Sequence, residues 1–230
     1  MTQTNATNST SSSGTKIILV RHGQSVANAG GRSSDHTTNP LTELGHTQAR
    51  SFAEAFSGSP TRFICSSYLR ARQTSEPLLQ KLCEVPVEDW PIHEFTYLEP
   101  THPTTDEQLM PRITEYWGRN DPAHIDGPTV ESFSSFLDRV RDALKRLAQT
   151  PPGEHIVIFT HGFWMQAFRL LLLFPNATDA ELMANFRRFH FNHFIDNTEA
   201  LEFEICNGQI HMLGQQHLNE FSLEGEPTHA

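Results

Sequence analysis

Three short apolar runs alternate with stretches of helical spacing, and this alternation constrains the fold of the 230-residue chain more than any other feature. The runs are KIILV at 16–20, RFICS at 62–66 and HIVIFT at 155–160. In the stretches that follow them, at 49–56, 69–82 and 163–173, apolar residues recur three and four positions apart. Short strands that alternate with helices favour a largely parallel sheet with helices packed on its faces.

Two more elements complete the predicted secondary structure. An amphipathic helix is expected between the second and third units, with an apolar face made by Val130, Phe133, Leu137, Val140, Leu144 and Leu147. Near the C-terminus, strand-like stretches at 201–205 and 209–213 flank Asn207-Gly208, a pair that accepts the positive φ angles of a tight turn. These stretches predict a terminal hairpin.

The chain is predicted to form one domain, at 16–215, with a tail at each end. A length of 230 residues fits one large domain or two small ones, at ~100 to 200 residues each, and no internal repeat divides it. Residues 1–15 are mostly Ser, Thr and Asn, which predicts a disordered tail because such a segment has little apolar surface to bury. Residues 216–230 are expected to form a second tail.

The segment 86–128 departs from the rhythm of strands and helices. It holds half of the fourteen prolines and shows no sustained period. We expect an excursion from the core. Long irregular insertions in compact domains are lids or binding loops, or they are surface elaborations, and the sequence leaves both open.

Charge and cysteine usage restrict the partners and the location of the protein. A formal net charge of -10 disfavours nucleic acid and anionic membrane surfaces, so an anionic substrate needs a local cationic pocket. No apolar stretch reaches the ~18 to 20 residues of a membrane span. Cys65, Cys83 and Cys206 are odd in number and widely spaced, which argues against a disulfide framework and a zinc site. With no secretion signal, this predicts a cytoplasmic protein of undetermined oligomeric state.

Polar residues follow each of the three strands at the point where the strand ends. Arg21-His22-Gly23 follows the first, Ser66 to Arg70 the second and Thr160-His161-Gly162 the third. Ligands of open α/β sheets bind outside the carboxyl ends of the strands. The sequence therefore predicts one site that collects two arginines and two histidines.

The residue types at this site point to a phosphate group. Arg21 and Arg70 carry planar guanidinium groups that match phosphate oxygens two at a time and keep their charge near neutral pH. Gly23 permits close backbone approach, and Ser25 and Asn28 add neutral donors. Walker-type, H-E-x-x-H and magnesium-binding acidic patterns do not occur. We expect a mechanism without a metal or another cofactor.

Four blocks in this order, RHGQSVAN, NPLTELGHTQAR, SSYLRARQT and FTHG, resemble the histidine phosphatase superfamily, whose members are phosphoglycerate mutase-like. They extend over about residues 16–165. The resemblance implies a three-layer α/β/α sandwich with a mostly parallel central sheet and a phosphorylated histidine intermediate. It makes His22 the nucleophile, with Arg21, Arg70 and His161 around the equatorial oxygens of the phosphoryl group, and these roles agree with the site described above.

Protonation of the leaving group needs a carboxylic acid near the pocket. The resemblance implies a hydrophobic-x-Glu pattern for this acid, which Ile92-His93-Glu94 matches, so Glu94 is the predicted proton donor. Glu99, five residues later, is the second candidate. The sequence also leaves open which nitrogen of His22 is the nucleophile.

The departures from the family favour hydrolysis over transfer of the phosphoryl group. The longer signature after RHG and the Glu-Arg-x-Tyr-Gly element of cofactor-dependent phosphoglycerate mutases are both missing. The sequence therefore predicts a metal-independent phosphatase, a histidine acid-type phosphomonoester hydrolase, acting on a small phosphorylated metabolite. A phosphoglycerate mutase or sugar bisphosphatase is one alternative, and a catalytically silent phosphate-binding or scaffolding protein is another.

Other polar residues carry weaker expectations. The pair His190 and His193 is interpreted as part of an aromatic surface, without a metal, because no third ligand has suitable spacing. Asn197-Thr198 matches a family pattern loosely and is left out of the predicted site. The leaving group is expected to contact the segment 86–128 together with Arg32, His36 and Arg112. Because that segment is rich in acids, we expect it to disfavour highly anionic substrates.

Overall fold

The structure is a computed structural model that describes residues 14–32, 35–100 and 102–224. The strands are β1 (Thr15–Arg21), β2 (Arg62–Ser66), β3 (Val87–Trp90), β4 (His155–Thr160), β5 (Ala200–Cys206) and β6 (Gln209–Met212). The helices are α1 (Glu43–Ala55), α2 (Leu69–Lys81), α3 (Asp106–Arg119), α4 (Phe133–Ala148), α5 (Gly162–Leu173), α6 (Asp179–Asn192) and the 3₁₀ helix η1 (Gln216–Glu220).

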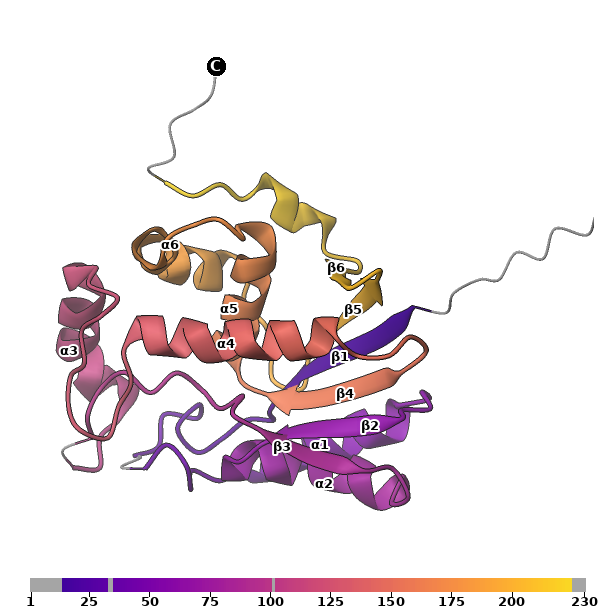
Figure 1. Cartoon of the computed structure of the whole chain (residues 1–230). Helices are drawn as coiled ribbons and strands as arrows, with labels where there is room; N and C mark the ends of the chain where they lie inside the picture. The colour runs from indigo at the N-terminus through magenta and orange to yellow at the C-terminus, as the bar shows by residue number, and fades with distance from the viewer. Residues whose placement is uncertain (1–13, 33–34, 101, 225–230) are drawn as a thin grey trace, which may run out of the picture.

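The strands form one sheet in the order β3-β2-β4-β1-β5-β6. The pairs β1·β4, β2·β4 and β2·β3 are parallel, and the pairs β1·β5 and β5·β6 are antiparallel, so β5 and β6 form an antiparallel edge. Helices α1 and α2 cover one face of the sheet, and α4, α5 and α6 cover the other (Figure 1). The predicted three-layer α/β/α sandwich with a mostly parallel sheet is confirmed.

The core consists of two apolar clusters, one on each face of the sheet. Along β1, Ile17 and Leu19 belong to one cluster, whereas Ile18 and Val20 belong to the other. Side chains of a strand alternate between its two faces, so a central strand covered by helices on both faces is apolar throughout. This explains why the predicted strands read as unbroken apolar runs.

The amphipathic helix and the hairpin are confirmed. Helix α4 begins at Phe133, directly after Ser132, whose hydroxyl accepts a hydrogen bond from the backbone N–H of Ser135 and caps the helix. Its predicted apolar positions Phe133, Leu137, Val140 and Leu147 are all buried. The hairpin turns at Asn207 and Gly208, whose φ angles are 54° and 76°.

The expectation that 86–128 lies outside the core is wrong. The segment contains β3 and α3, and its residues Ile92, Phe95, Leu98 and Tyr116 are buried in the larger core cluster. Prolines do not prevent this, because the chain from 91 to 100 forms neither helix nor strand and Pro111 is accommodated inside α3. The aromatic residues of the segment supply the apolar surface that places it in the core.

Both predicted tails have different boundaries in the structure. Residues 1–13 lie outside the described residues, and β1 already begins at Thr15. Residues 216–224 are part of the folded domain, because η1 forms and Leu218 and Leu223 are buried. Phe221 packs on the ring of Phe189 at a centroid distance of 4.9 Å. Isolated apolar residues in a polar segment were too weak a signal to predict this contact.

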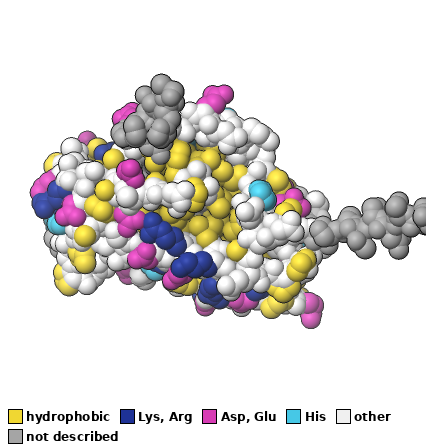
Figure 2. All heavy atoms as spheres, turned by 45° about the horizontal axis from the view of Figure 1, so that its top comes forward, with side chains coloured by type: hydrophobic (Ala, Val, Ile, Leu, Met, Phe, Trp, Pro, Cys, Tyr) yellow, Lys and Arg dark blue, Asp and Glu magenta, His cyan; other side chains and the backbone are white. Residues whose placement is uncertain are grey.

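One face of the molecule leaves apolar side chains partly uncovered. Half-buried residues that pack on the larger cluster include Leu144, Leu173, Phe174, Met212 and Phe221. Figure 2 shows hydrophobic side chains gathered in the middle of the face turned forward, beside a row of Lys and Arg side chains. In the part of the chain that the structure describes, no helix is long and apolar enough to cross a membrane.

Candidate active site

A cavity of about 230 Å³ opens where β1 and β2 end and collects most of the predicted site residues. Its lining includes Arg21, His22, Asn28, Arg70, Glu94 and Glu99. His161 lies behind the lining, fully buried, with its ring centroid 5.1 Å from that of His22. Register explains the convergence, since Arg21 at the end of β1 pairs with Thr160 at the end of β4.

The two ring nitrogens of His22 have different partners. Nδ1 lies 2.7 Å from the carbonyl oxygen of Gly23, and Nε2 lies 3.1 Å from Nε of Arg70. A guanidinium can only donate, so Nε2 accepts and Nδ1 carries the proton that it donates to Gly23. Burial lowers the pKa of His22 well below its ordinary value, and the charges of Arg70 and Arg21 lower it further. The ring is therefore neutral, with a lone pair on Nε2.

A close contact between backbones holds the loop that carries His22. A Cβ atom on Gly23 would lie 2.7 Å from the carbonyl oxygen of Gly45 in α1, and one on Gly45 would lie 2.1 Å from that of Gln24. The backbone N–H of Gly23 donates to Oγ1 of Thr74 in α2 at 2.9 Å. The φ angle of Gly23 is not positive, so its backbone conformation would accept another residue. Glycine is needed here because a side chain would not fit against Gly45.

Arg21 and Arg70 are both buried and held by backbone carbonyl groups. Nη1 of Arg21 donates to the carbonyl oxygen of Ile195 at 2.5 Å, and Nη1 of Arg70 donates to that of His36 at 2.7 Å. Burial lowers the pKa of each guanidinium, and the carboxylate of Glu94 opposes the shift in both. Nε of Arg21 is buried without a partner among the described residues. Two oriented guanidinium groups thus face one small cavity.

His161 stands directly before α5 and is oriented by a residue that the sequence did not single out as a ligand. Its Nε2 lies 2.8 Å from Oγ of Ser66, at the end of β2. Nδ1 is buried and has no partner within the described part of the chain. Burial lowers the pKa of His161 well below its ordinary value, so this ring is neutral as well.

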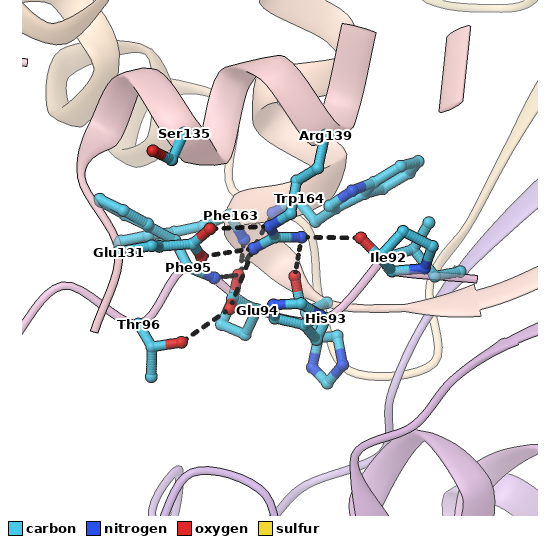
Figure 3. A network of polar contacts seen from close by, with 12 residues as sticks. Ile92, His93, Glu94, Phe95, Thr96, Glu131, Ser135, Arg139, Phe163 and Trp164 are labelled. Carbon is cyan, nitrogen blue, oxygen red and sulfur yellow. Dashed lines mark hydrogen bonds and ion pairs between the residues drawn. The ribbon is translucent and has the colours of Figure 1, made fainter. Parts of the chain in front are cut away.

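The carboxylate of Glu94 lies at the N-terminus of α5. Oε2 accepts from the backbone N–H of Phe163, and Oε1 accepts from that of Trp164, each at 3.2 Å (Figure 3). Oε1 also accepts from the N–H of Phe95 at 3.1 Å. These donors are otherwise unsatisfied at a helix start, and the helix dipole favours a negative charge there. The carboxylate is thereby held at the cavity.

Arg139 of α4 fixes the chain around Glu94. It donates to the carbonyl oxygen of His93 at 2.7 Å and to that of Glu94 at 3.2 Å. Its guanidinium also pairs with the carboxylate of Glu131 at 2.7 Å, and Figure 3 shows it reaching between these groups. The pair is largely buried, so removing either side chain would leave an uncompensated buried charge and destabilise the fold. Nothing in the sequence indicated this role of Arg139.

Glu99 also lines the cavity, and its carboxylate is fixed by Thr129. It accepts from the backbone N–H of Thr129 at 2.9 Å and from the hydroxyl of the same residue at 2.8 Å. Its backbone N–H donates to Asp126. Glu99 therefore ties the chain at 99 to 126–129, whereas the carboxylate of Glu94 binds the N-terminus of α5, which begins directly after His161.

Asn197 belongs to the site although the sequence analysis left it out. Its Nδ2 donates to the carbonyl oxygen of His22 at 2.9 Å and approaches Oδ1 of Asn28 at 3.4 Å. The next residue, Thr198, has a φ angle of 61°, and its N–H donates to the carbonyl oxygen of Arg21. Asn28 is oriented in turn by the N–H of Ser25 at 3.2 Å. The loose family pattern was the available signal.

Of the remaining polar residues considered from the sequence, the structure places only some at the cavity. His190 packs on the ring of Phe163 at 4.8 Å, and His193 packs on Phe189 at 4.9 Å, so both belong to an aromatic cluster. The described residues contain no group of three or more His, Cys, Asp or Glu arranged for a metal ion. His36 lines the cavity, whereas Arg32 and Arg112 do not.

Curated relatives include enzymes that act on phosphate esters. The chain is 28% identical over 183 residues to a metal-independent phosphoserine phosphatase of Arabidopsis thaliana, covering 76% of each chain. It is 31% identical over 158 residues to a probable phosphoglycerate mutase of Serratia proteamaculans, covering 64% of this chain and 69% of that one. An adenosylcobalamin/alpha-ribazole phosphatase of Salmonella typhi is 29% identical over 175 residues, covering 71% and 82%.

Solved structures share the fold. A putative alpha-ribazole-5'-P phosphatase from Escherichia coli superposes with a TM-score of 0.67 at 23% identity, over 86% of this chain and 94% of that one. A phosphoserine phosphatase variant from Entamoeba histolytica, in complex with phosphoserine, gives 0.67 at 21% identity, over 86% and 95%. The family model described as histidine phosphatase superfamily (branch 1) matches residues 17–214. The chain belongs to the histidine phosphatase superfamily, branch 1.

Proposed function

We propose that this protein is a metal-independent phosphomonoester hydrolase that works through a phosphohistidine intermediate on a small phosphorylated metabolite. The observation that carries this proposal is the neutral His22, whose unprotonated Nε2 lines the cavity with the buried Arg21 and accepts a hydrogen bond from the buried Arg70. Relatives named as a metal-independent phosphoserine phosphatase and as alpha-ribazole phosphatases support the same reaction.

In the first step, Nε2 of His22 attacks phosphorus and the bond from phosphorus to the ester oxygen breaks. Arg21, Arg70 and Asn28 bind the equatorial oxygens, with His161 behind them, so that charge on these oxygens is stabilised by groups already in place. Glu94, in its protonated form, gives its proton to the departing oxygen. The products are the free alcohol and a phosphohistidine.

In the second step, water attacks the phosphorus atom of the phosphohistidine. The carboxylate of Glu94 accepts a proton from that water, and the bond between phosphorus and Nε2 breaks. Inorganic phosphate leaves, and His22 returns to its neutral form. Glu94 is proposed over Glu99 because its carboxylate is held at the N-terminus of α5, beside His161. Its charge also interacts with Arg21 and Arg70 and raises the pKa of both guanidinium groups.

Hydrolysis is favoured over the mutase alternative by the charge of the cavity. Among the described lining residues, Arg21 and Arg70 are the Lys and Arg side chains, and both are assigned to the phosphoryl group. The described lining therefore offers no further Lys or Arg to hold the carboxylate of a phosphoglycerate while the phosphoryl group is transferred to His22 and back. A silent scaffold is disfavoured because it would have no use for a nucleophile kept neutral by burial.

We further propose that the enzyme is of the acid phosphatase type. The lowered pKa of His22 keeps its nucleophilic nitrogen unprotonated in mildly acidic solution, where an exposed histidine gains a proton. A cytoplasmic location stays a prediction. It is compatible with Cys65, Cys83 and Cys206, which are all free thiols.

The test is hydrolysis of p-nitrophenyl phosphate in excess chelator, by the wild type and by two histidine variants. The wild type should turn over, whereas His22→Ala should lose at least ~10³-fold in kcat, because removing a covalent nucleophile removes the pathway. Rapid quenching should trap an acid-labile phosphoprotein in the wild type and none in His22→Ala. The matched control is His211→Ala, an exposed residue of β6 outside the cavity, which should behave like the wild type.

Loss of turnover upon chelation would refute the metal-independent mechanism. Normal turnover in His22→Ala would refute the nucleophile. Binding of phosphate esters with no turnover in the wild type would support the silent alternative instead.

A further inference from the structure

The part of the cavity beyond the phosphate-binding residues is lined by apolar and aromatic side chains, which we call the apolar wall. Its members are Phe95, Tyr97, Leu98, Leu109, Ile113 and Phe163. They come from the excursion, from α3 and from the first turn of α5. Because Arg21 and Arg70 are assigned to the phosphoryl group, we expect the alcohol esterified to the phosphate to contact this wall.

The apolar wall is packed and preformed. The rings of Phe95 and Tyr97 are stacked at 5.1 Å, and those of Tyr97 and Phe163 at 6.4 Å. Behind them, Phe95 stacks on Phe136 of α4 at 4.6 Å. An apolar group can therefore bind without first ordering the side chains that receive it, which preserves binding free energy.

The leaving-group side of the cavity has no fixed cation in the described lining. Arg112, the arginine expected to contact the substrate, donates to the carbonyl oxygen of Glu99 at 3.0 Å and pairs with the carboxylate of Asp126. It does not line the cavity. Arg112 thus stabilises the excursion and does not receive an anionic leaving group.

Two carboxylates besides that of Glu94 also line the cavity, those of Asp35 and Glu99. Hydrogen bonds from Thr37 and Thr38 lower the pKa of Asp35 to about 2, so this group is ionised at neutral pH. The carboxylate of Glu99 is fixed by Thr129. A carboxylate or second phosphate on the leaving group would approach these like charges, which is unfavourable.

Resting on the phosphatase activity proposed above, we propose that this cavity selects phosphomonoesters of an uncharged, largely apolar alcohol and discriminates against alcohols that carry a carboxylate or a second phosphate. The volume of about 230 Å³ lies below the ~300 to 1,000 Å³ of pockets for drug-sized ligands, so the alcohol is one ring or a short chain. The carboxylates of Asp35 and Glu99 disfavour an anionic leaving group, and the apolar wall favours an apolar one.

The test compares benzyl phosphate with 4-carboxybenzyl phosphate, because the two leaving groups have similar intrinsic reactivity and differ by one remote carboxylate. The wild type should prefer the benzyl ester by about tenfold or more in kcat/KM, mainly through KM, as expected for one unfavourable charge contact. A ratio near one, or preference for the carboxylate, would overturn the inference. If neither ester is hydrolysed and no phosphoprotein forms, the proposed function fails and the inference fails with it.

Two neighbouring residues of α3 provide a matched pair of variants. Leu109→Lys places an ammonium group in the apolar wall, whereas Met110→Lys places it on a side chain that is 45% exposed and outside the cavity lining. Leu109→Lys should lower the benzyl preference about tenfold, and Met110→Lys should leave the ratio within about twofold. An equal effect of both variants would refute the role of the wall.

The acids are tested separately, so that one misfolded variant does not decide the outcome. The double variant Asp35→Asn, Glu99→Gln should lower the benzyl preference, whereas Glu107→Gln, an exposed acid of α3 outside the lining, should not. An unchanged ratio in the double variant would refute the exclusion by charge.

Discussion

At the scale of single residues, the orientation of His22 is the most informative feature. The carbonyl oxygen of Gly23 takes the proton of Nδ1, and Arg70 donates to Nε2. Because a guanidinium cannot accept, this pair of contacts assigns the tautomer without reference to the reaction. Arg70, which is proposed to bind the substrate phosphate, also acts through its charge, after burial, to lower the pKa of His22.

The tautomer and the protonation state of His22 can be observed directly. We expect ¹⁵N spectra of the wild type to show Nδ1 protonated and Nε2 bare from pH 8 down to about 5.5, because burial and the two arginines lower the pKa of His22 well below about 6.5. Arg70→Gln should raise the titration midpoint, since it removes one of these charges. A midpoint near 6.5 in the wild type would contradict the assignment.

At the scale of elements, the site depends on how closely α1 approaches the loop after β1. Thr42 caps α1 by accepting from the N–H of Gly45, and Gln24 accepts from the N–H of Thr42 at 2.9 Å. Gly45 then lies against the backbone of Gln24, two residues from His22. The helix packs so closely that a side chain at either glycine would separate the two segments.

Substitution of Gly45 should affect both stability and activity. In Gly45→Ala the new methyl group would lie 2.1 Å from a backbone carbonyl oxygen, so we expect a loss of ~1–3 kcal/mol in the free energy of unfolding and lower kcat/KM. Gly118→Ala in α3 is the control, since open space surrounds that position and the exchange should be neutral or stabilising by up to ~1 kcal/mol. Urea unfolding and steady-state kinetics measure the two effects. Similar behaviour of the two variants would disprove the close contact.

At the scale of the whole molecule, the protein buries several histidines in neutral form. His22 and His161 are fully buried and their pKa values are lowered well below the ordinary value by burial first and by neighbouring charges second. Burial also lowers the pKa of His93 and of His190, each to about 4. In the unfolded chain all of these groups gain a proton as the pH falls through about 6.5.

Stability should therefore decline in mildly acidic solution. Below about pH 6.5 the unfolded state binds protons that the native state does not, so the free energy of unfolding falls with pH until the lowered native pKa values are reached. His22 and His161 should each contribute a slope of up to about 1 kcal/mol per pH unit between the pKa of the unfolded chain and the lowered native pKa. Urea unfolding at pH 7.5, 6 and 5 measures the slope, and His161→Asn should reduce it. Constant stability across this range would refute the prediction.

The sequence by itself determined the class of the fold and that the two arginines and two histidines lie together at one edge of the sheet. Strands buried on both faces are apolar along their length, so the strands at 16–20, 62–66 and 155–160 could be predicted from the sequence. Parallel strands end at one edge, so Arg21, His22, Arg70 and His161 could be placed together. Both inferences depend on short-range patterns that local chain geometry makes visible.

The tertiary structure alone decided everything that depends on contacts between distant segments. The tautomer of His22 depends on Arg70, the position of the Glu94 carboxylate depends on the start of α5, and the backbone carbonyl of His22 is bound by Asn197. The core role of 86–128 and of 216–224 arises from single aromatic and aliphatic residues that fill gaps left by other elements. No period marks such residues along the chain, because what selects them is the three-dimensional packing around them.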